Sequence, residues 1–129
     1  MSRYDDGRLH LEWARQADGR GDFRYARAEY LKSVESFRQA KQDGTRGEVE
    51  WIDATKEYEG FVKRDPFFID LLARLLPLIQ QHPGMLQSDV PKHHPDLPRE
   101  DISYALYFAA QFGKITRTKK GRSYELTAN

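Results

Sequence analysis

Apolar residues in the first half of the chain recur every three or four positions, which is the period of an amphipathic helix. Three such runs are separated by the glycines at 19 and 21 and by a polar break at residues 42–45. The apolar positions are Leu9, Leu11, Trp13, Ala14 and Ala17, then Ala26, Tyr30, Val34 and Phe37, then Val49, Ile52, Ala54, Tyr58, Phe61 and Val62. Asp22 is a natural N-terminal cap for the second run. The pattern predicts two helices joined at the glycines and a third, looser helix over residues 47–64.

The most apolar run of the chain covers residues 66–79. Asp70 and Arg74 interrupt it four residues apart, so it predicts an amphipathic core helix and not a membrane span, which needs about 20 nearly uncharged residues. We expect Pro77 to kink this helix or to shorten its last turn. After the turn at Pro83-Gly84, residues 85–86 are expected to form a short strand, and Ser88 to cap a brief helix that ends near His93.

A longer helix is predicted over residues 97–112, with Asp96 as an acidic cap and Pro98 in its first turn. Its apolar positions recur at helical spacing until Gly113 and are Ile102, Ala105, Leu106, Ala109 and Phe112. If that stripe is buried, the residues toward solvent are Arg99, Ser103, Tyr104, Tyr107 and Gln111. Their hydrogen-bonding groups suit contact with the edges of bases, although partial burial of the tyrosines is an equal alternative.

A two-stranded hairpin is predicted over residues 114–126, with its tip at Thr118-Lys119-Lys120-Gly121 and a positive φ at Gly121. Between positions 114 and 122 the chain has no acidic residue and five basic ones, Lys114, Arg117, Lys119, Lys120 and Arg122. Such a cluster favours contact with nucleic-acid phosphates. The alternative is a solvated turn whose lysines protect a sheet edge.

The segment from Pro83 to Val90, followed by Gly113 to Arg117 and by Gly121 to Leu126, resembles the winged-helix domains of bacterial and archaeal regulators. The resemblance covers residues 66–127. It implies a winged helix-turn-helix fold that contacts DNA through the solvent face of the 97–112 helix and through a wing at residues 114–126. The chain departs from the DNA-binding pattern in its acidic pair Glu100-Asp101, which argues against base-specific readout. Winged helices also dock proteins.

The Gly-Asp-Phe-x-x-Ala-x-x-x-Tyr spacing over residues 21–30 resembles a tetratricopeptide-type helical hairpin. A single unit of that kind leaves an apolar face uncovered, so we expect dimerisation or partner binding through the N-terminal helices. The aromatic residues that we expect to mark a partner surface are Trp13, Tyr25 and Trp51, although burial in the core is the alternative for the tryptophans.

Together these elements predict a mainly α fold with an α+β C-terminal part. A helical region spans residues 1–64, and a winged helix with a small antiparallel sheet spans residues 65–129. The basic and acidic residues number 13 and 13 in residues 1–64, and 8 and 7 in residues 65–129. Because the net charge is only +1, any affinity for DNA has to come from the local cluster and from dimerisation.

No constellation of catalytic residues is present, so we expect a protein that is not an enzyme and has no cofactor. The absence of cysteine excludes disulfides and thiolate metal sites. His82, His93, His94 and Asp96 lie around prolines, where adjacent histidines usually point apart, so we expect no metal site. No signal peptide or membrane span is legible, and a cytoplasmic location is expected.

Two functions remain open. The first is a DNA-binding transcriptional regulator that dimerises through its N-terminal helices and places two winged helices on double-stranded DNA. The second is a non-enzymatic scaffold in which the winged helix docks protein instead of DNA.

Overall fold

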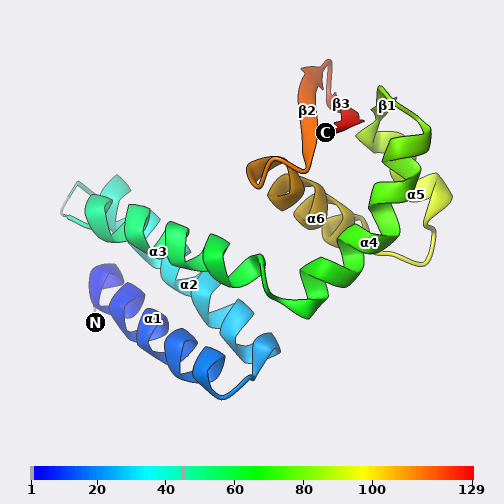
Figure 1. Ribbon diagram of the computed structural model, residues 1–129. Helices are drawn as coiled ribbons and strands as arrows, with labels where there is room; N and C mark the ends of the chain where they lie inside the picture. The colour runs from blue at the N-terminus through cyan, green and yellow to red at the C-terminus, as the bar shows by residue number, and fades with distance from the viewer. Residues whose placement is uncertain (1, 45) are drawn as a thin grey trace. The chain divides into compact units, whose positions relative to one another are not determined.

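The computed structural model describes residues 2–44 and 46–129 (Figure 1). Thr45, which belongs to the predicted break, lies outside the described residues. The chain divides into two compact units, Met1–Asp65 and Pro66–Asn129. The predicted mainly α fold with an α+β C-terminal part is confirmed, because helices dominate both units and the strands all lie near the C-terminus.

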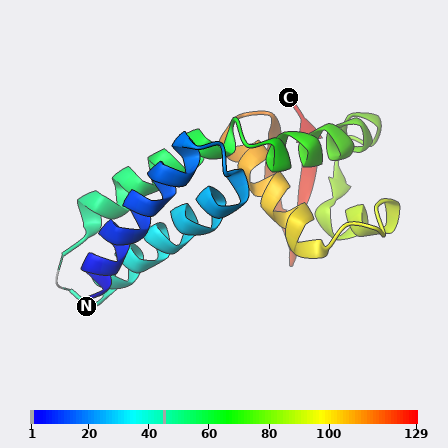
Figure 2. The same cartoon turned by 90° about the horizontal axis from the view of Figure 1, so that it is seen from below.

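The first unit consists of three helices, α1 (Arg3–Gly19), α2 (Phe23–Gln42) and α3 (Glu48–Val62). The central helix, α2, packs against both α1 and α3 (Figures 1 and 2). Asp22 caps α2 as predicted, since its carboxylate accepts a hydrogen bond from the N–H of Tyr25 at 3.2 Å. Gly21, in the preceding turn, has a φ of 76°, a conformation that favours glycine.

The core of the first unit contains Ala14, Ala26, Tyr30, Phe37 and Phe61, each at most 3% exposed. The small residues let α1 and α2 approach closely, the rings of Tyr30 and Phe61 fill the space between α2 and α3, and the Phe37 ring lies against Tyr4 of α1. The Tyr30 and Phe61 ring centroids are 5.2 Å apart.

Two apolar positions of the third predicted run lie outside this core, because Val49 and Ile52 are 66% and 41% exposed. They occupy the first turn and a half of α3, and the buried face of this helix begins at Ala54.

Ion pairs fix the end of the first unit. Asp65 is fully buried and accepts two hydrogen bonds from Arg27, at 2.7 and 3.0 Å. Arg64 pairs with Asp18 at the end of α1. Its guanidinium lowers the pKa of Asp18, whose carboxylate also accepts a hydrogen bond from Tyr30. These contacts hold the last residues of the unit against α1 and α2.

The second unit begins with α4 (Pro66–Gln81), followed by β1 (Met85–Leu86), the 3₁₀ helix η1 (Gln87–Asp89), α5 (Val90–His93), α6 (Arg99–Gln111), β2 (Ile115–Lys120) and β3 (Ser123–Ala128). The strands form an antiparallel sheet in the order β1-β3-β2. The predicted short strand at residues 85–86 is confirmed by its pairing with Leu126 and Glu125.

Pro77 lies inside α4, and the helix continues for another turn to Gln81. Of the two predicted effects of Pro77, the shortened last turn is therefore wrong, and the kink stays a prediction. Burial explains this result, because Leu75 and Ile79, on either side of Pro77, are both fully buried. The packing of their side chains outweighs the loss of one backbone hydrogen bond.

The core of the second unit joins all of its larger elements. Its fully buried members include Leu75 and Ile79 of α4, Leu106 of α6 and Leu126 of β3. Val90, in the short α5, is also fully buried and connects that helix to the same cluster. This shared core fixes α6 and the hairpin relative to each other. Among the described residues, no helix is long and apolar enough to cross a lipid bilayer.

Candidate functional site

The exposed face of α6 is formed by residues four positions apart. Ile102, Ala105, Leu106 and Ala109 are buried as predicted, and Phe108 is buried beside them. Arg99, Ser103, Tyr107 and Gln111 are exposed, which matches the predicted solvent face. A single helix therefore carries a cation, a hydroxyl, a phenol and an amide along one side.

Tyr104 departs from this pattern and corrects the prediction that it faces solvent. Its ring is half-buried and packs against the core of the second unit. The Tyr104 ring centroid lies 5.0 Å from that of Phe108 and 5.7 Å from that of Phe67. The alternative of partial burial is the one that the structure adopts, because Tyr104 packs against Phe108 one turn further along α6 and against Phe67 of α4.

The start of α6 differs from the predicted capping. Pro98 occupies the cap position, where no side chain caps the helix, and its carbonyl accepts from the N–H groups of Asp101 and Ile102. Asp96 instead accepts a hydrogen bond from Arg74 of α4 at 2.6 Å. That contact lowers the pKa of Asp96. The expected Asp96 cap is wrong because the carboxylate is paired with a different helix.

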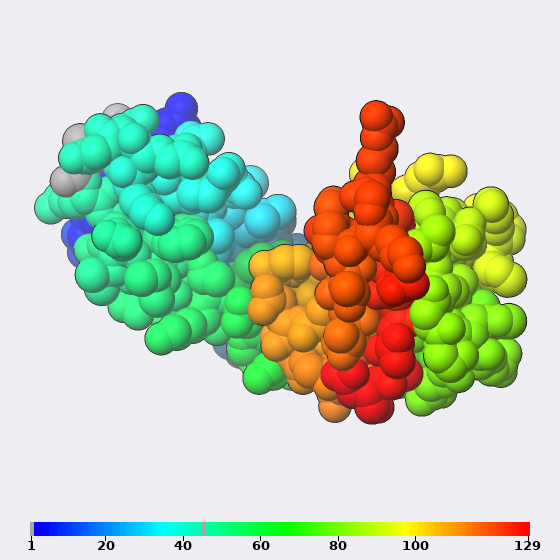
Figure 3. All heavy atoms as spheres, turned by 90° about the horizontal axis from the view of Figure 1, so that it is seen from above, coloured from blue at the N-terminus to red at the C-terminus, as the bar shows by residue number. Residues whose placement is uncertain are grey.

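The hairpin turn contains two residues, Gly121 and Arg122, since Lys120 and Ser123 are still paired across the strands. Gly121 has the expected positive φ, 61°. The predicted four-residue tip is too long, because Thr118, Lys119 and Lys120 belong to β2. In the space-filling view of Figure 3, the orange-red atoms of the hairpin form a ridge that ends in a narrow projection.

Aromatic stacking orders two hairpin cations. The guanidinium carbon of Arg117 lies 3.9 Å from the Tyr124 ring centroid, and Lys119 Nζ lies 4.9 Å from it. Arg117 also donates from Nε to Gln87 Oε1 at 3.2 Å. These contacts orient both side chains without neutralising them, because a ring and an amide carry no net charge.

Lys120 is in a different situation. Its Nζ lies 3.1 Å from Glu125 Oε1 on the facing strand, so one of the five cations has an acidic partner within the hairpin. In the sequence, Glu125 lies beyond residues 114–122, which include no acidic residue. The fold of the hairpin places it beside Lys120. Among the described residues, Lys114 and Arg122 make no ion pair and are exposed.

A groove of about 210 Å³ runs between α6 and the hairpin. It unites residues far apart in the chain, since Arg99 and Ser103 come from α6, and Arg122 and Tyr124 come from the hairpin. The complete lining is Gln87, Ser88, Pro91, Arg99, Ile102, Ser103, Arg122, Ser123 and Tyr124. Of the predicted nucleic-acid-binding residues, Tyr104, Tyr107, Lys114, Arg117, Lys119 and Lys120 do not line it.

Six lining residues were not predicted as part of a site, Gln87, Ser88, Pro91, Ile102, Ser123 and Tyr124. Ser88 was expected to cap a helix, but α5 has no side-chain cap and Ser88 lies in η1. Its backbone N–H donates to Ser123 Oγ at 3.1 Å, which ties η1 to the hairpin. Ser123 lies two positions after the turn glycine, so the sequence could have marked it as a residue near the hairpin turn. Its partner Ser88 lies 35 positions away, and no local pattern connects the two.

The three expected partner-binding residues lie on three different helices of the first unit. Trp13 and Tyr25 are 37% and 43% exposed, and Trp51 is half-buried. Each tryptophan contacts a polar or charged neighbour, since Trp13 meets the His10 ring and Lys41 Nζ lies 4.4 Å from the Trp51 ring centroid. No ring contact joins the three within the described part of the chain.

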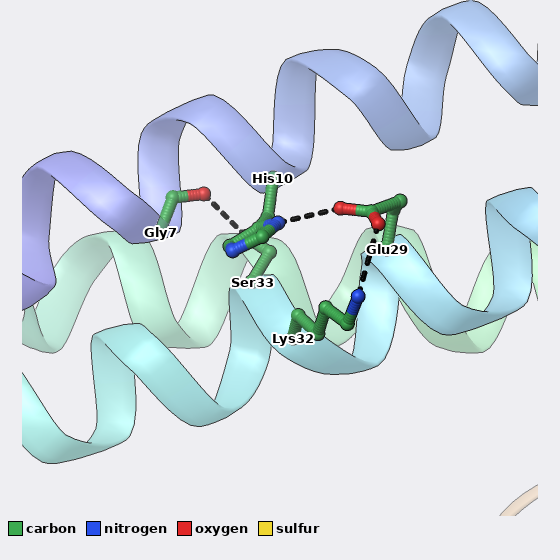
Figure 4. A network of polar contacts seen from close by, with 5 residues as sticks. All are labelled: Gly7, His10, Glu29, Lys32 and Ser33. Atoms are coloured by element: carbon green, nitrogen blue, oxygen red, sulfur yellow. Dashed lines mark hydrogen bonds and ion pairs between the residues drawn. The ribbon is translucent and has the colours of Figure 1, made fainter.

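A polar network connects α1 and α2 (Figure 4), and its His10 ring contacts Trp13. His10 Nδ1 lies 2.5 Å from Oε2 of the buried Glu29, and Lys32 Nζ lies 3.3 Å from the other carboxylate oxygen. Nearby, the Ser33 hydroxyl donates to the Gly7 carbonyl at 2.7 Å. The partners of the buried carboxylate compensate its charge, which gives the network a structural role.

The other polar surfaces are weaker candidates for a functional site. A wider hollow of about 680 Å³ is lined by six residues of α1 alone, from Asp5 to Arg15, so it is an open helix surface. The His82 and His93 rings lie 5.9 Å apart. Within residues 2–44 and 46–129, no group of three or more histidine or acidic side chains is placed to hold a metal ion.

Comparison with protein-family models, with curated proteins and with solved structures finds no match for this chain.

Proposed function

We propose that residues 66–129 form a winged-helix domain that binds double-stranded DNA, as part of a transcriptional regulator. In this proposal α6 enters the major groove and the hairpin, as the wing, contacts phosphates. The observation that carries the proposal is the groove in which Arg99 and Ser103 of α6 meet Arg122 of the hairpin turn. A duplex that touches one of these elements is within reach of the other.

The order of elements supports the same proposal. A helix, a short strand, two further helices and a two-stranded hairpin follow one another, and the shared core fixes α6 beside the hairpin. The exposed stripe of Arg99, Ser103 and Tyr107 offers donors and acceptors of the kinds that contact base edges and phosphates. Contacts from a rigid helix lose less conformational entropy on binding than contacts from a mobile loop.

The charge balance favours weak binding by a single domain. Glu100 and Asp101 lie in the first turn of α6, and Glu125 pairs with Lys120. We therefore propose that the N-terminal helices supply a dimer contact or a partner surface through Trp13 and Tyr25. Two domains on one duplex gain affinity through effective concentration without any new contact to DNA.

The same acids support the second candidate, a winged helix that docks protein. A surface of mixed charge at α6 and the hairpin suits a polar protein partner better than a uniformly negative duplex. This candidate predicts that duplex binding is absent at physiological salt concentration.

The test is the affinity of the full chain for a random-sequence duplex, measured by fluorescence anisotropy over a series of salt concentrations. Replacement of Lys119, Lys120 and Arg122 by Ala is expected to weaken binding on all sequences alike. It should also flatten the salt dependence by about 0.9 for each phosphate that is no longer neutralised. Glu125→Gln is expected to tighten binding, because it releases Lys120 from its carboxylate partner.

A matched control replaces Arg3, Arg24 and Lys56 by Ala, which removes the same charge from the first unit and leaves the hairpin unaltered. If this control weakens binding as much as the hairpin variant does, attraction is a net-charge effect and the wing has no special role. Absence of measurable duplex binding by the unaltered chain would favour the protein-docking candidate.

A further inference from the structure

We infer that the groove between α6 and the hairpin is a pocket for a single phosphate group. The pocket rests on the proposed function and deepens it, since it names the chemical group that this part of the interface holds. Phosphate binding there does not require a duplex, because the residues that would donate all line one local hollow of about 210 Å³. The phosphate can therefore belong to a DNA backbone or to a small phosphorylated molecule.

Charge is segregated in the lining of the groove. Arg99 and Arg122 both line it, and the lining includes no acidic side chain. Glu100 and Asp101, although they follow Arg99 directly, do not line it. Glu125 instead pairs with Lys120. The groove is thus a cationic site within a surface of nearly balanced charge.

The two cations of the groove are both arginines. Arginine presents a planar fork of N–H donors that matches two oxygens of a phosphate, and it keeps its charge at any ordinary pH. Arg99 begins a helix and Arg122 lies in a hairpin turn, so the two side chains come from different elements. Donors from separate directions fit a tetrahedral anion better than a planar carboxylate.

The hydroxyl of Ser123 adds a neutral donor to the groove. Its oxygen accepts the hydrogen bond from the backbone N–H of Ser88, and a hydroxyl that accepts in this way keeps its own proton to donate. Ser103, one turn after Arg99 on α6, adds a second exposed hydroxyl to the lining. The groove therefore combines two charged donors with two neutral ones, which is sufficient for the oxygens of one phosphate group.

The experiment titrates the full chain with inorganic phosphate and follows backbone amide signals by NMR. A saturable shift is expected at Ser88, Ser103, Arg122 and Ser123, with the Ser88 N–H as the most direct reporter of the Ser123 hydroxyl. Arg99→Gln combined with Arg122→Gln should weaken phosphate binding about tenfold to a hundredfold. Arg24→Gln removes an exposed cation of the first unit and should leave the affinity unchanged.

A second arm repeats the titration with a duplex that lacks terminal phosphates. If the duplex displaces inorganic phosphate from the groove, the pocket holds a backbone phosphate. If phosphate binds in the groove and the duplex does not, the pocket stands with a small phosphorylated ligand, and the proposed DNA function fails.

The phosphate pocket is overturned by either of two results. One is that phosphate shifts are spread over all basic residues without saturation, or are lost equally in Arg24→Gln. The other is that inorganic phosphate binds the Arg99→Gln, Arg122→Gln variant with unaltered affinity, in which case the two guanidinium groups do not hold it. Preserved signal dispersion in each variant shows that the fold is intact.

Discussion

A Cβ atom placed on Gly7 of α1 would lie 2.7 Å from the ring of Phe37 in α2. Phe37 is 1% exposed and is held between helices, so its ring has little room to move away. At the same point the Ser33 hydroxyl reaches the Gly7 carbonyl at 2.7 Å. Glycine at position 7 therefore sets the distance between the first two helices.

Gly7→Ala is expected to destabilise the first unit by about 1 to 2 kcal/mol. Overpacking of a core typically costs about 1 to 3 kcal/mol, and the better helix propensity of alanine returns up to about 1 kcal/mol. Both tryptophans, Trp13 and Trp51, lie in this unit, so thermal unfolding followed by tryptophan fluorescence reports it selectively. Gly19→Ala is the matched control, since no atom lies within 4 Å of a Cβ there. An unchanged melting temperature in Gly7→Ala would show that Phe37 repacks freely.

Tyr30 makes the stability of the first unit depend on alkaline pH. Burial raises the pKa of its phenol to about 12, with help from the negative charge of Asp18. In the unfolded chain the phenol has its ordinary pKa of 10.0. The stabilisation is therefore complete below pH 10 and is lost as the pH rises toward 12. Urea unfolding across this window should show falling stability. Tyr30→Phe should be less stable at neutral pH, because its hydrogen bond to Asp18 is lost, and should show a smaller decline. An equal decline in both proteins would assign the effect to other groups.

Leu106→Ala is expected to destabilise the second unit by about 2 to 5 kcal/mol. Leu106 is fully buried in the cluster that includes Leu75 of α4 and Leu126 of β3, and truncation leaves a cavity there. Thermal unfolding followed by circular dichroism measures the loss, with the exposed Gln111→Ala as the control on the same helix. If the Leu106→Ala and Gln111→Ala proteins melt together, α6 does not pack on the core through Leu106.

In the dimer model, self-association is expected to depend on Trp13 and Tyr25. Both side chains are more than a third exposed, and large aromatic residues dominate the energetics of protein contacts. Trp13→Ser combined with Tyr25→Ser should reduce the molecular mass measured by sedimentation at a concentration where the unaltered chain is dimeric. Ile69→Ser, which removes a 47% exposed apolar residue from the second unit, should not. A monomeric unaltered chain would exclude the dimer model, and Trp13 and Tyr25 would then be candidates for contact with a different protein.

The elements were largely predictable from the sequence, because most of them are specified by local patterns. The apolar stripe from Ile102 to Ala109 defined α6 and its buried face. The glycine at 121 marked the turn, and the position of the short strand at Met85 followed from the Pro83-Gly84 turn before it. These features depend on neighbours within a few positions, and the physical preferences that produce them act over the same range.

The candidate site was less predictable, because its arrangement depends on contacts between distant residues. Asp96 and Ser88 are residue types that often cap helices. In the structure, however, Asp96 accepts a hydrogen bond from Arg74, and the backbone N–H of Ser88 donates to Ser123. Glu125 lies outside the basic segment in the sequence, but it pairs with Lys120 on the facing strand of the hairpin. Arg99 and Arg122 line the same groove because α6 packs against the sheet. No local sequence pattern predicts that packing.

The strand order of the second unit has a consequence for synthesis of the chain. β3 lies in the middle of the sheet and pairs with both β1 and β2, although it is the last of the three to be made. On the ribosome, β1 and β2 therefore emerge without their shared neighbour, and the groove beside α6 stays incomplete until residues 123–128 have left the exit tunnel. The three helices of the first unit do not depend on β3. They can therefore fold before the central strand of the sheet has been synthesised.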